Sequence, residues 1–136
     1  MAAVATTVTG KVEVIRDDRS KTLVAAADIN AWQAIRKNTS GKWVLANATD
    51  AANSVGVHIA LRTVKAGQAL TGMRRGKLGG LAALGTYQAP LYLSDTSGTI
   101  QTTAGTVSVV LARVAASTGN VITDAHDKNV EVDCPF

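Results

Sequence analysis

Residues 55–62 read Val-Gly-Val-His-Ile-Ala-Leu-Arg, and large aliphatic side chains occupy every second position of this stretch. The alternation returns in residues 107–111, which read Val-Ser-Val-Val-Leu. Because successive side chains of a strand point to opposite faces of a sheet, a period of two predicts strands with one face in a core. Val110 and Val114 fall on the other side of the second stretch, which predicts that this strand is covered on both faces.

Outside these stretches, shorter alternations are separated by turn-forming residues. The alternations lie at residues 8–14, 43–45, 91–93 and 130–132. Clusters of Asp, Asn, Ser, Thr and Gly lie at residues 17–20, 38–41, 94–98 and 117–120. These residue types favour turns through local side-chain hydrogen bonds and tolerance of positive φ. We therefore predict an all-β fold, a small antiparallel β-sandwich or barrel, in which the first two clusters close hairpins.

Two stretches leave the type of element open. Residues 25–37 are rich in Ala and Ile, and they suit either a helix or a strand. We favour mostly strand with one helical turn, because the stretch runs directly into the turn at residues 38–41. Residues 66–85 contain six glycines. This density predicts bulges, tight bends or close backbone approach, and a long flexible loop is the alternative.

The length predicts one domain, residues 1–136, with a mass of 14.0 kDa. Aromatic residues make up only 4% of the chain, which predicts a shallow core of the kind that oligomerisation completes. The polar ends, residues 1–7 and 124–136, are predicted to be extended arms. The sequence shows neither a signal-peptide pattern nor an apolar run of about 18 residues, so we expect no membrane partner.

The net charge of +4 and the pI near 9.5 are compatible with an acidic protein partner or with nucleic acid. Arg74, Arg75 and Lys77 form the densest basic cluster, and the nearest aromatic residue is Tyr87. RNA-binding and single-strand-binding modules combine basic residues with aromatic ones, so we do not expect a nucleic-acid partner. The cluster is predicted to be either a solvated loop or a contact for an acidic protein surface.

No set of residues predicts catalysis, a metal or a cofactor. His58 lies within an alternating stretch and is predicted to be a surface or interface histidine. Asp124, His126 and Asp127 supply one histidine and two carboxylates, which is too few ligands to predict a metal site. Cys134 is the only cysteine, and it is predicted to be a buried or terminal apolar residue in a protein made in a reducing cytoplasm. Phosphate-binding glycine loops and nucleophile elbows are absent from the sequence, so we predict that the chain is not an enzyme.

Candidate partner-binding residues also lie at the end of the chain: Val130, Val132 and Phe136. A terminal aromatic side chain can fill a pocket on a neighbouring protein. We therefore expect deletion of residues 130–136 to weaken assembly more than folding.

Several motifs follow one another in a recognisable order. Residues 38–52 read Asn-Thr-Ser-Gly-Lys-Trp-Val-Leu-Ala-Asn-Ala-Thr-Asp-Ala-Ala, and residues 54–61 read Ser-Val-Gly-Val-His-Ile-Ala-Leu. They are followed by Ala-Gly-Gln-Ala-Leu, Gly-Thr-Tyr, Pro-Leu-Tyr-Leu-Ser, Ser-Gly and the valine-rich residues 107–115. This order, over about residues 30–118, resembles the decoration (cement) proteins of tailed-bacteriophage heads.

The resemblance implies a compact β-sandwich or barrel on the outer capsid surface of a virion. There it would bridge neighbouring major capsid protein subunits, as a homotrimer or homodimer, and stabilise the expanded shell against the pressure of its DNA. The family supplies no catalytic residues. This chain departs from the family in its basic charge, its first strands and its segment 119–136, which leaves the oligomeric state and the docking site open.

Two other functions stay open. A tail-associated or host-recognition β module would need exposed aromatic side chains for glycans, but Trp32 and Trp43 flank the 38–41 turn and are predicted to pack in the core. A basic β-barrel that binds nucleic acid would show an affinity that falls steeply with salt.

Overall fold

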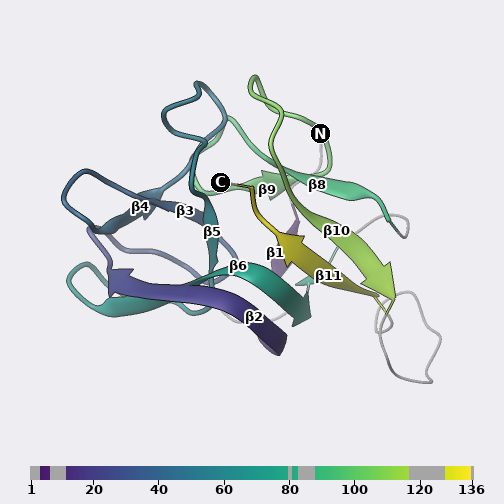
Figure 1. Ribbon diagram of the computed structural model, residues 1–136, viewed down its shortest axis with the longest axis horizontal. Helices are drawn as coiled ribbons and strands as arrows, with labels where there is room; N and C mark the ends of the chain where they lie inside the picture. The colour runs from purple at the N-terminus through teal and green to yellow at the C-terminus, as the bar shows by residue number, and fades with distance from the viewer. Residues whose placement is uncertain (1–3, 7–11, 80, 83–87, 117–127, 136) are drawn as a thin grey trace.

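Nine of the described strands form one curled antiparallel sheet around the main core, as Figure 1 shows for this computed structural model. No helix occurs in the part of the chain that the structure describes, which comprises residues 4–6, 12–79, 81–82, 88–116 and 128–135. The strands are β1 (Ala5–Thr6), β2 (Glu13–Val24), β3 (Ala34–Lys37), β4 (Trp43–Leu45), β5 (His58–Ala60), β6 (Ala69–Gly79), β7 (Leu81–Ala82), β8 (Pro90–Leu93), β9 (Ile100–Gln101), β10 (Val110–Ala116) and β11 (Lys128–Asp133). The predicted all-β fold is confirmed.

Strand β6 organises the sheet because it is paired along both of its edges. One edge pairs with β2 over the whole length of β6. The other edge pairs first with β5, at Gly72 and Met73, and then with β11, from Arg75 to Leu78. The nine-stranded sheet therefore has the order β4-β3-β5-β6-β11-β10-β8-β9, with β2 attached to β6 outside this path, while β1 and β7 form a separate two-stranded sheet.

The two ends of the curled sheet are joined by backbone hydrogen bonds. Gly98 N–H donates to the carbonyl oxygen of Ala46 at 2.7 Å, and Ala34 N–H donates to the carbonyl oxygen of Gly98 at 3.0 Å. Close by, Ala48 N–H donates to the carbonyl oxygen of Ser94 at 2.9 Å. Of the two predicted architectures, the curled sheet corresponds to a partly closed barrel, which satisfies backbone groups that an open edge would leave to solvent.

Two apolar cores lie on the two faces of β3 and β5. Ala34 and Ile59 belong to the larger core inside the curl, whereas their neighbours Ile35 and Ala60 belong to the smaller one. The smaller core consists of Ala25, Ile29, Ile35, Trp43, Ala60, Val64 and Leu70. Because both faces are covered, consecutive residues of these short strands are buried, which a single period of two does not predict.

The prediction for residues 55–62 is correct in the middle and wrong at the start. Val57 and Ile59 are fully buried, as their alternation predicts. Val55, however, is 57% exposed, because the strand begins only at His58 and residues 51–56 form turns and bends ahead of it.

The predicted hairpin at residues 17–20 is wrong, because β2 continues through it. Asp17 pairs with Gly76 and Arg19 pairs with Arg75, which leaves Asp18 as an extra residue in a bulge. Two further register shifts follow the same pattern along β2 and β6. A bulge absorbs the irregular backbone that Asp and Ser favour without reversing the chain, so turn-forming residues here bend a strand instead of ending it.

Residues 25–37 contain a strand only at their end, as β3, and the helical turn that we expected is absent. Ile29 N–H donates to the carbonyl oxygen of Val64 at 3.0 Å, and Trp32 adopts a positive φ of 74° at the turn that follows. The hairpin at residues 38–41 is confirmed, because it joins β3 to the antiparallel β4.

The glycine-rich stretch is largely the strand β6 and not a flexible loop. Close backbone approach is confirmed at Gly72, where a Cβ atom would lie 2.9 Å from the Cβ of His58 and 3.1 Å from Cδ1 of Ile35. Only glycine lets these side chains and Trp43 pack directly on the β6 backbone. Residues 80 and 83–87 lie outside the described part of the chain.

The predicted C-terminal arm is wrong for β11, which lies in the sheet between β6 and β10. Val130, Val132 and Cys134 are buried in the main core. Their alternation places apolar side chains where burial removes them from water, and this stabilises the strand inside the sheet. The expectations for residues 1–3, 7, 117–120, 124–127 and 136 lie outside the described part of the chain.

Candidate protein-binding groove

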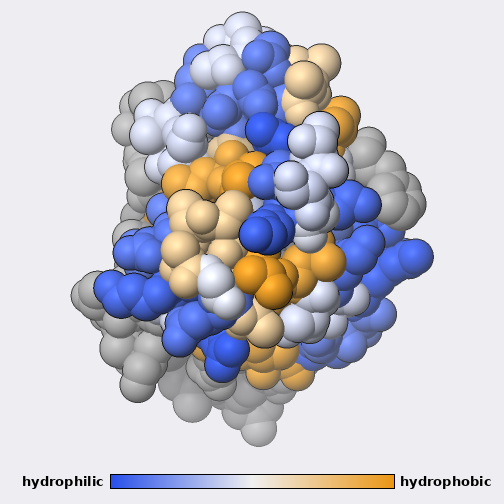
Figure 2. All heavy atoms as spheres, turned by 90° about the vertical axis from the view of Figure 1, so that its left-hand side faces the viewer, coloured by the Kyte–Doolittle hydropathy of each residue, from blue (hydrophilic) through white to orange (hydrophobic). Residues whose placement is uncertain are grey.

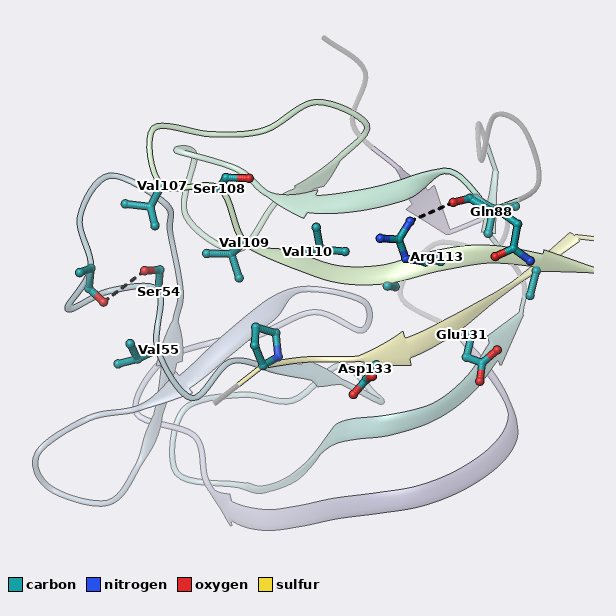
Figure 3. A pocket seen from close by; sticks show the side chains of 15 residues that line it. Ser54, Val55, Gln88, Val107, Ser108, Val109, Val110, Arg113, Glu131 and Asp133 are labelled. Atoms are coloured by element: carbon teal, nitrogen blue, oxygen red, sulfur yellow. Dashed lines mark hydrogen bonds between the residues drawn. The ribbon is translucent and has the colours of Figure 1, made fainter.

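An open groove of about 640 Å³ crosses the outer side of β10 and β11, as Figure 3 shows. One wall is the loop at residues 51–55, and the other side is the start of β10 with the segment that leads into it. The lining residues are Ala51, Ser54, Val55, Gln88, Val107, Ser108, Val109, Val110, Ala112, Arg113, Val114, Ala115, Glu131, Asp133 and Pro135.

A bulge in β10 makes the floor of the groove apolar. Val110 pairs with Tyr92 and Ala112 pairs with Leu91, so Leu111 is an extra residue on β10. Leu111 and Ala112 are both buried, and Val110 is left half-buried at the groove. The strand was predicted to be covered on both faces because Val110 and Val114 fall opposite Leu111 in a period of two. The bulge changes this phase, so that Leu111 and Val114 belong to the same core while Val110 stays half-buried.

The loop wall is held by short-range hydrogen bonds. Ser54 Oγ donates to the carbonyl oxygen of Ala51 at 3.1 Å, and Asn53 N–H donates to Oδ1 of Asp50 at 2.9 Å. Val55 follows this turn directly and lies at the rim of the groove, exposed to solvent. A large apolar side chain that is exposed on an ordered rim is available to a partner at little cost in conformational entropy.

The segment on the other side of the groove is fixed by Asp95. Thr106 donates twice to this carboxylate, from its N–H at 2.8 Å and from its Oγ1 at 2.7 Å. Both bonds lower the pKa of Asp95 below its ordinary value, and the bond from the Thr106 hydroxyl has the larger effect. Val107 N–H then donates to the carbonyl oxygen of Ala48 at 2.8 Å. The apolar wall is therefore positioned before any partner binds.

Charged side chains mark the far end of the groove. Arg113 pairs across the strands with Glu131, and its NH1 donates to the carbonyl oxygen of Gln88 at 3.2 Å. Glu131 lies 3.6 Å from Arg16, and Asp133 lies 3.4 Å from Arg75. These carboxylates have basic neighbours on the adjacent strands, so the groove carries charges of both signs.

The predicted basic cluster lies on β6 and not on a loop. Arg75 is exposed, Arg74 and Lys77 are half-buried, and Arg74 is the extra residue of the bulge opposite Arg19 and Ser20. Asp133 on β11 lies opposite Arg75, so acidic residues interrupt this cluster.

The other predicted partner-binding residues are not brought to this surface. Val130 and Val132 are corrected to core residues, because they are 0% and 2% exposed. Phe136 lies outside the described part of the chain.

Two titratable side chains that do not line the groove, His58 and Cys134, also have perturbed pKa values. Burial lowers the pKa of His58, whose ring lies 5.0 Å from that of Trp43. Burial raises the pKa of the Cys134 thiol to about 12, and the prediction of a buried apolar cysteine is confirmed. Within the described ranges, no three His, Cys, Asp or Glu side chains gather in a way that would hold a metal ion.

Sequence reasoning missed the groove because its walls are far apart in the chain. Residues 51–55 and 107–115 meet only after the sheet has curled, and no local pattern reports that approach. The run of small and β-branched residues at 107–115 was the one available signal, and it was assigned to the core.

Comparison with protein-family models and with curated proteins does not place this chain in a family. No protein-family model matches the chain, and no curated protein matches it in sequence. Over the described ranges, the structure has no helix with the length and apolar character needed to cross a bilayer.

Proposed function

We propose that this protein is a non-catalytic structural protein that binds the outer surface of a bacteriophage capsid and stabilises it by bridging major capsid protein subunits. The observation that carries the proposal is the open, largely apolar groove on the outside of the partly closed, hydrogen-bonded sheet. The order of motifs in residues 38–115 supports the choice of a capsid as the partner. The protein would then be a component of the virion that self-associates on the shell.

The shape of the groove favours a protein segment as its occupant. Its floor and rim are formed by Val55, Val107, Val110 and Ala112, and its charged groups lie together at one end. Protein interfaces commonly combine an apolar centre with a polar rim. The groove is also partly open to solvent, which suits a segment of another protein better than a fully enclosed small molecule.

The burial of both tryptophans argues against the glycan-binding alternative. Trp32 and Trp43 are buried, with Nε1 of Trp32 donating to the carbonyl oxygen of Val4 at 2.9 Å. Neither indole ring is therefore available to stack on a sugar.

The test is co-sedimentation of the purified protein with expanded phage heads that lack it, followed by heat release of the packaged DNA. We expect saturable binding that raises the temperature of DNA release. Val55→Asp should weaken binding at least about tenfold, or about 1.4 kcal/mol, because it places a carboxylate in the apolar contact. Val14→Asp is the matched control, since Val14 is also exposed, at 45%, and does not line the groove.

Two results would contradict the proposal. A folded wild-type protein that does not sediment with any expanded head has no capsid role. Equal binding by the Val55→Asp and Val14→Asp proteins would remove the groove from the contact.

A further inference from the structure

Basic residues are concentrated in one part of the chain. Residues 19–77 contain ten basic residues and two acidic ones, whereas the rest of the sequence contains four basic and eight acidic residues. The basic part includes β3, β4, β5 and most of β6, and β3 and β4 occupy the left-hand end of the molecule in Figure 1. Five of these ten basic residues lie in or next to β3, β4 and the loop that follows β5: Arg36, Lys37, Lys42, Arg62 and Lys65. Positive charge therefore exceeds negative charge at this end.

That end also carries an apolar patch, which Figure 2 shows as orange and pale orange spheres among hydrophilic ones. We use the term end patch for the exposed or half-buried apolar residues of three segments at this end: Val24, Ala26, Ala27, Val44, Leu45 and Ala66. Val24 is 40% exposed. None of these residues lines the groove.

Backbone hydrogen bonds hold the three segments of the end patch together. Ala26 N–H donates to the carbonyl oxygen of Trp43 at 2.9 Å, which fixes the segment after β2 against β4. Gly67 N–H donates to the carbonyl oxygen of Ala25 at 2.8 Å, which fixes the loop after β5 against the same segment. The smaller core lies beneath, with Trp43 and Ala25 as members. The end patch is thus part of the ordered fold.

Basic residues lie beside each segment of the end patch. Lys42 precedes β4, and Lys37 pairs with Trp43 across the hairpin. Arg62 NH2 donates to the carbonyl oxygen of Ala69 at 2.9 Å. Lys65 lies 3.8 Å from Asp28, the one acidic residue between residues 19 and 49. Positive charge around an apolar centre is complementary to an acidic surface with small apolar side chains.

We propose that the end patch is a docking surface for an acidic protein surface, separate from the groove. A protein is favoured over nucleic acid for two reasons on this face. The apolar centre has no counterpart on a phosphate backbone, and Trp32 and Trp43 are buried and cannot stack on bases. A protein that bridges two subunits needs two contact surfaces, so the bridging role of the end patch rests on the proposed capsid function.

The test measures binding to a random copolymer of glutamate and alanine, with duplex DNA as the competing polyanion. Two variants alter the end patch: Val24→Asp changes its most exposed large apolar residue, and Lys42→Glu/Lys65→Glu changes two basic residues next to it in sequence. Val14→Asp is the control for the first, and Arg75→Glu/Lys77→Glu, with the same change in net charge, is the control for the second. Circular dichroism verifies that each variant is folded, which their surface positions favour.

We expect each end-patch variant to weaken binding to the copolymer at least about tenfold at low salt, and each control to stay within about threefold of wild type. Equal losses in Lys42→Glu/Lys65→Glu and Arg75→Glu/Lys77→Glu would overturn the proposal, because net charge alone would then explain binding. Wild-type affinity in Val24→Asp, or tighter binding to DNA than to the copolymer, would also overturn it.

The same variants on phage heads separate this proposal from the proposed function. Heads that bind every end-patch variant as they bind wild type would overturn the end patch as a capsid contact and leave the groove in place. Wild-type protein that binds the copolymer through the end patch but binds no heads would overturn the capsid function alone.

Discussion

Trp43 donates a 2.8 Å hydrogen bond from its indole Nε1 to the carbonyl oxygen of Leu70. This hydrogen bond connects β4 directly to β6, although β3 and β5 separate these two strands in the sheet order. The Cζ2 atom of Trp43 lies where it would be 3.1 Å from a Cβ atom on Gly72. One buried side chain thus ties the hairpin at residues 38–41 to the central strand, and the missing Cβ of Gly72 makes room for it.

Gly72→Ala is expected to destabilise the fold by about 1–3 kcal/mol, because the added methyl group overpacks the smaller core. Urea unfolding measures the loss. Trp43→Phe removes the Cζ2 contact, so the double variant should lose less than the sum of the two single losses. Strict additivity would show that the ring does not limit the space at Gly72.

Deletion of residues 130–136 is expected to abolish folding, which reverses the expectation from sequence. The deletion removes most of β11 from between β6 and β10 and exposes both strands. Circular dichroism and proteolysis should show an unfolded chain. Deletion of Phe136 alone is the control, and a folded protein after the long deletion would show that β11 is dispensable.

The thiol of Cys134 is expected to resist alkylation in the folded protein at pH 8. Its pKa is raised to about 12 by burial, so the reactive thiolate is scarce and also inaccessible. Mass spectrometry should detect one adduct after unfolding in denaturant, because the chain has a single cysteine. Rapid modification under native conditions would mean that the end of β11 opens readily.

His58 is expected to destabilise the fold as the pH falls below about 6.5. Burial lowers the pKa of the folded state below this ordinary value, so the unfolded state binds the proton more readily. Stability should therefore decrease from pH 7.5 down through the lowered pKa and then level off. Urea unfolding of wild type and His58→Gln measures the effect, and an equal pH dependence in both would assign it to other groups.

Asp95→Asn is expected to loosen the segment that forms one side of the groove. The pKa of Asp95 is lowered by the two bonds from Thr106, so these bonds stabilise the wild type above about pH 4 and are lost as the pH falls through the lowered pKa. Hydrogen exchange at the Thr106 amide should be faster in Asp95→Asn than in wild type. Asp28→Asn, far from this segment in sequence, is the control and should leave that amide unchanged.

The sequence predicted the parts of the fold that depend on local patterns. The turn at residues 38–41 is local, since Asn38 N–H donates to the carbonyl oxygen of Lys42 at 2.8 Å and Gly41 supplies a φ of 78°. The burial of Val57 and Ile59 follows from the alternation of residues 57–59. Such features need no knowledge of where the rest of the chain lies.

The parts that failed depend on long-range pairing. Asp18 lies in a bulge only because Asp17 and Arg19 pair with consecutive residues of β6, more than fifty positions later. Val130 and Val132 were predicted to lie in an arm, because nothing near them in sequence shows that β6 and β10 pair with their strand. The groove could not be predicted for the same reason. Its floor depends on a bulge in β10, and its rim depends on residues 51–55, which are distant in the sequence.

The bulges of β2 have a consequence for the molecule at high concentration. Among the described strands, β6 is the only one that pairs with β2, so the other side of this 12-residue strand is an edge. A flat edge of that length would recruit identical edges and grow into fibrils. Three register shifts and the charges of Arg16, Asp17, Asp18 and Arg19 break that template. Many copies can therefore crowd together without merging into a continuous sheet.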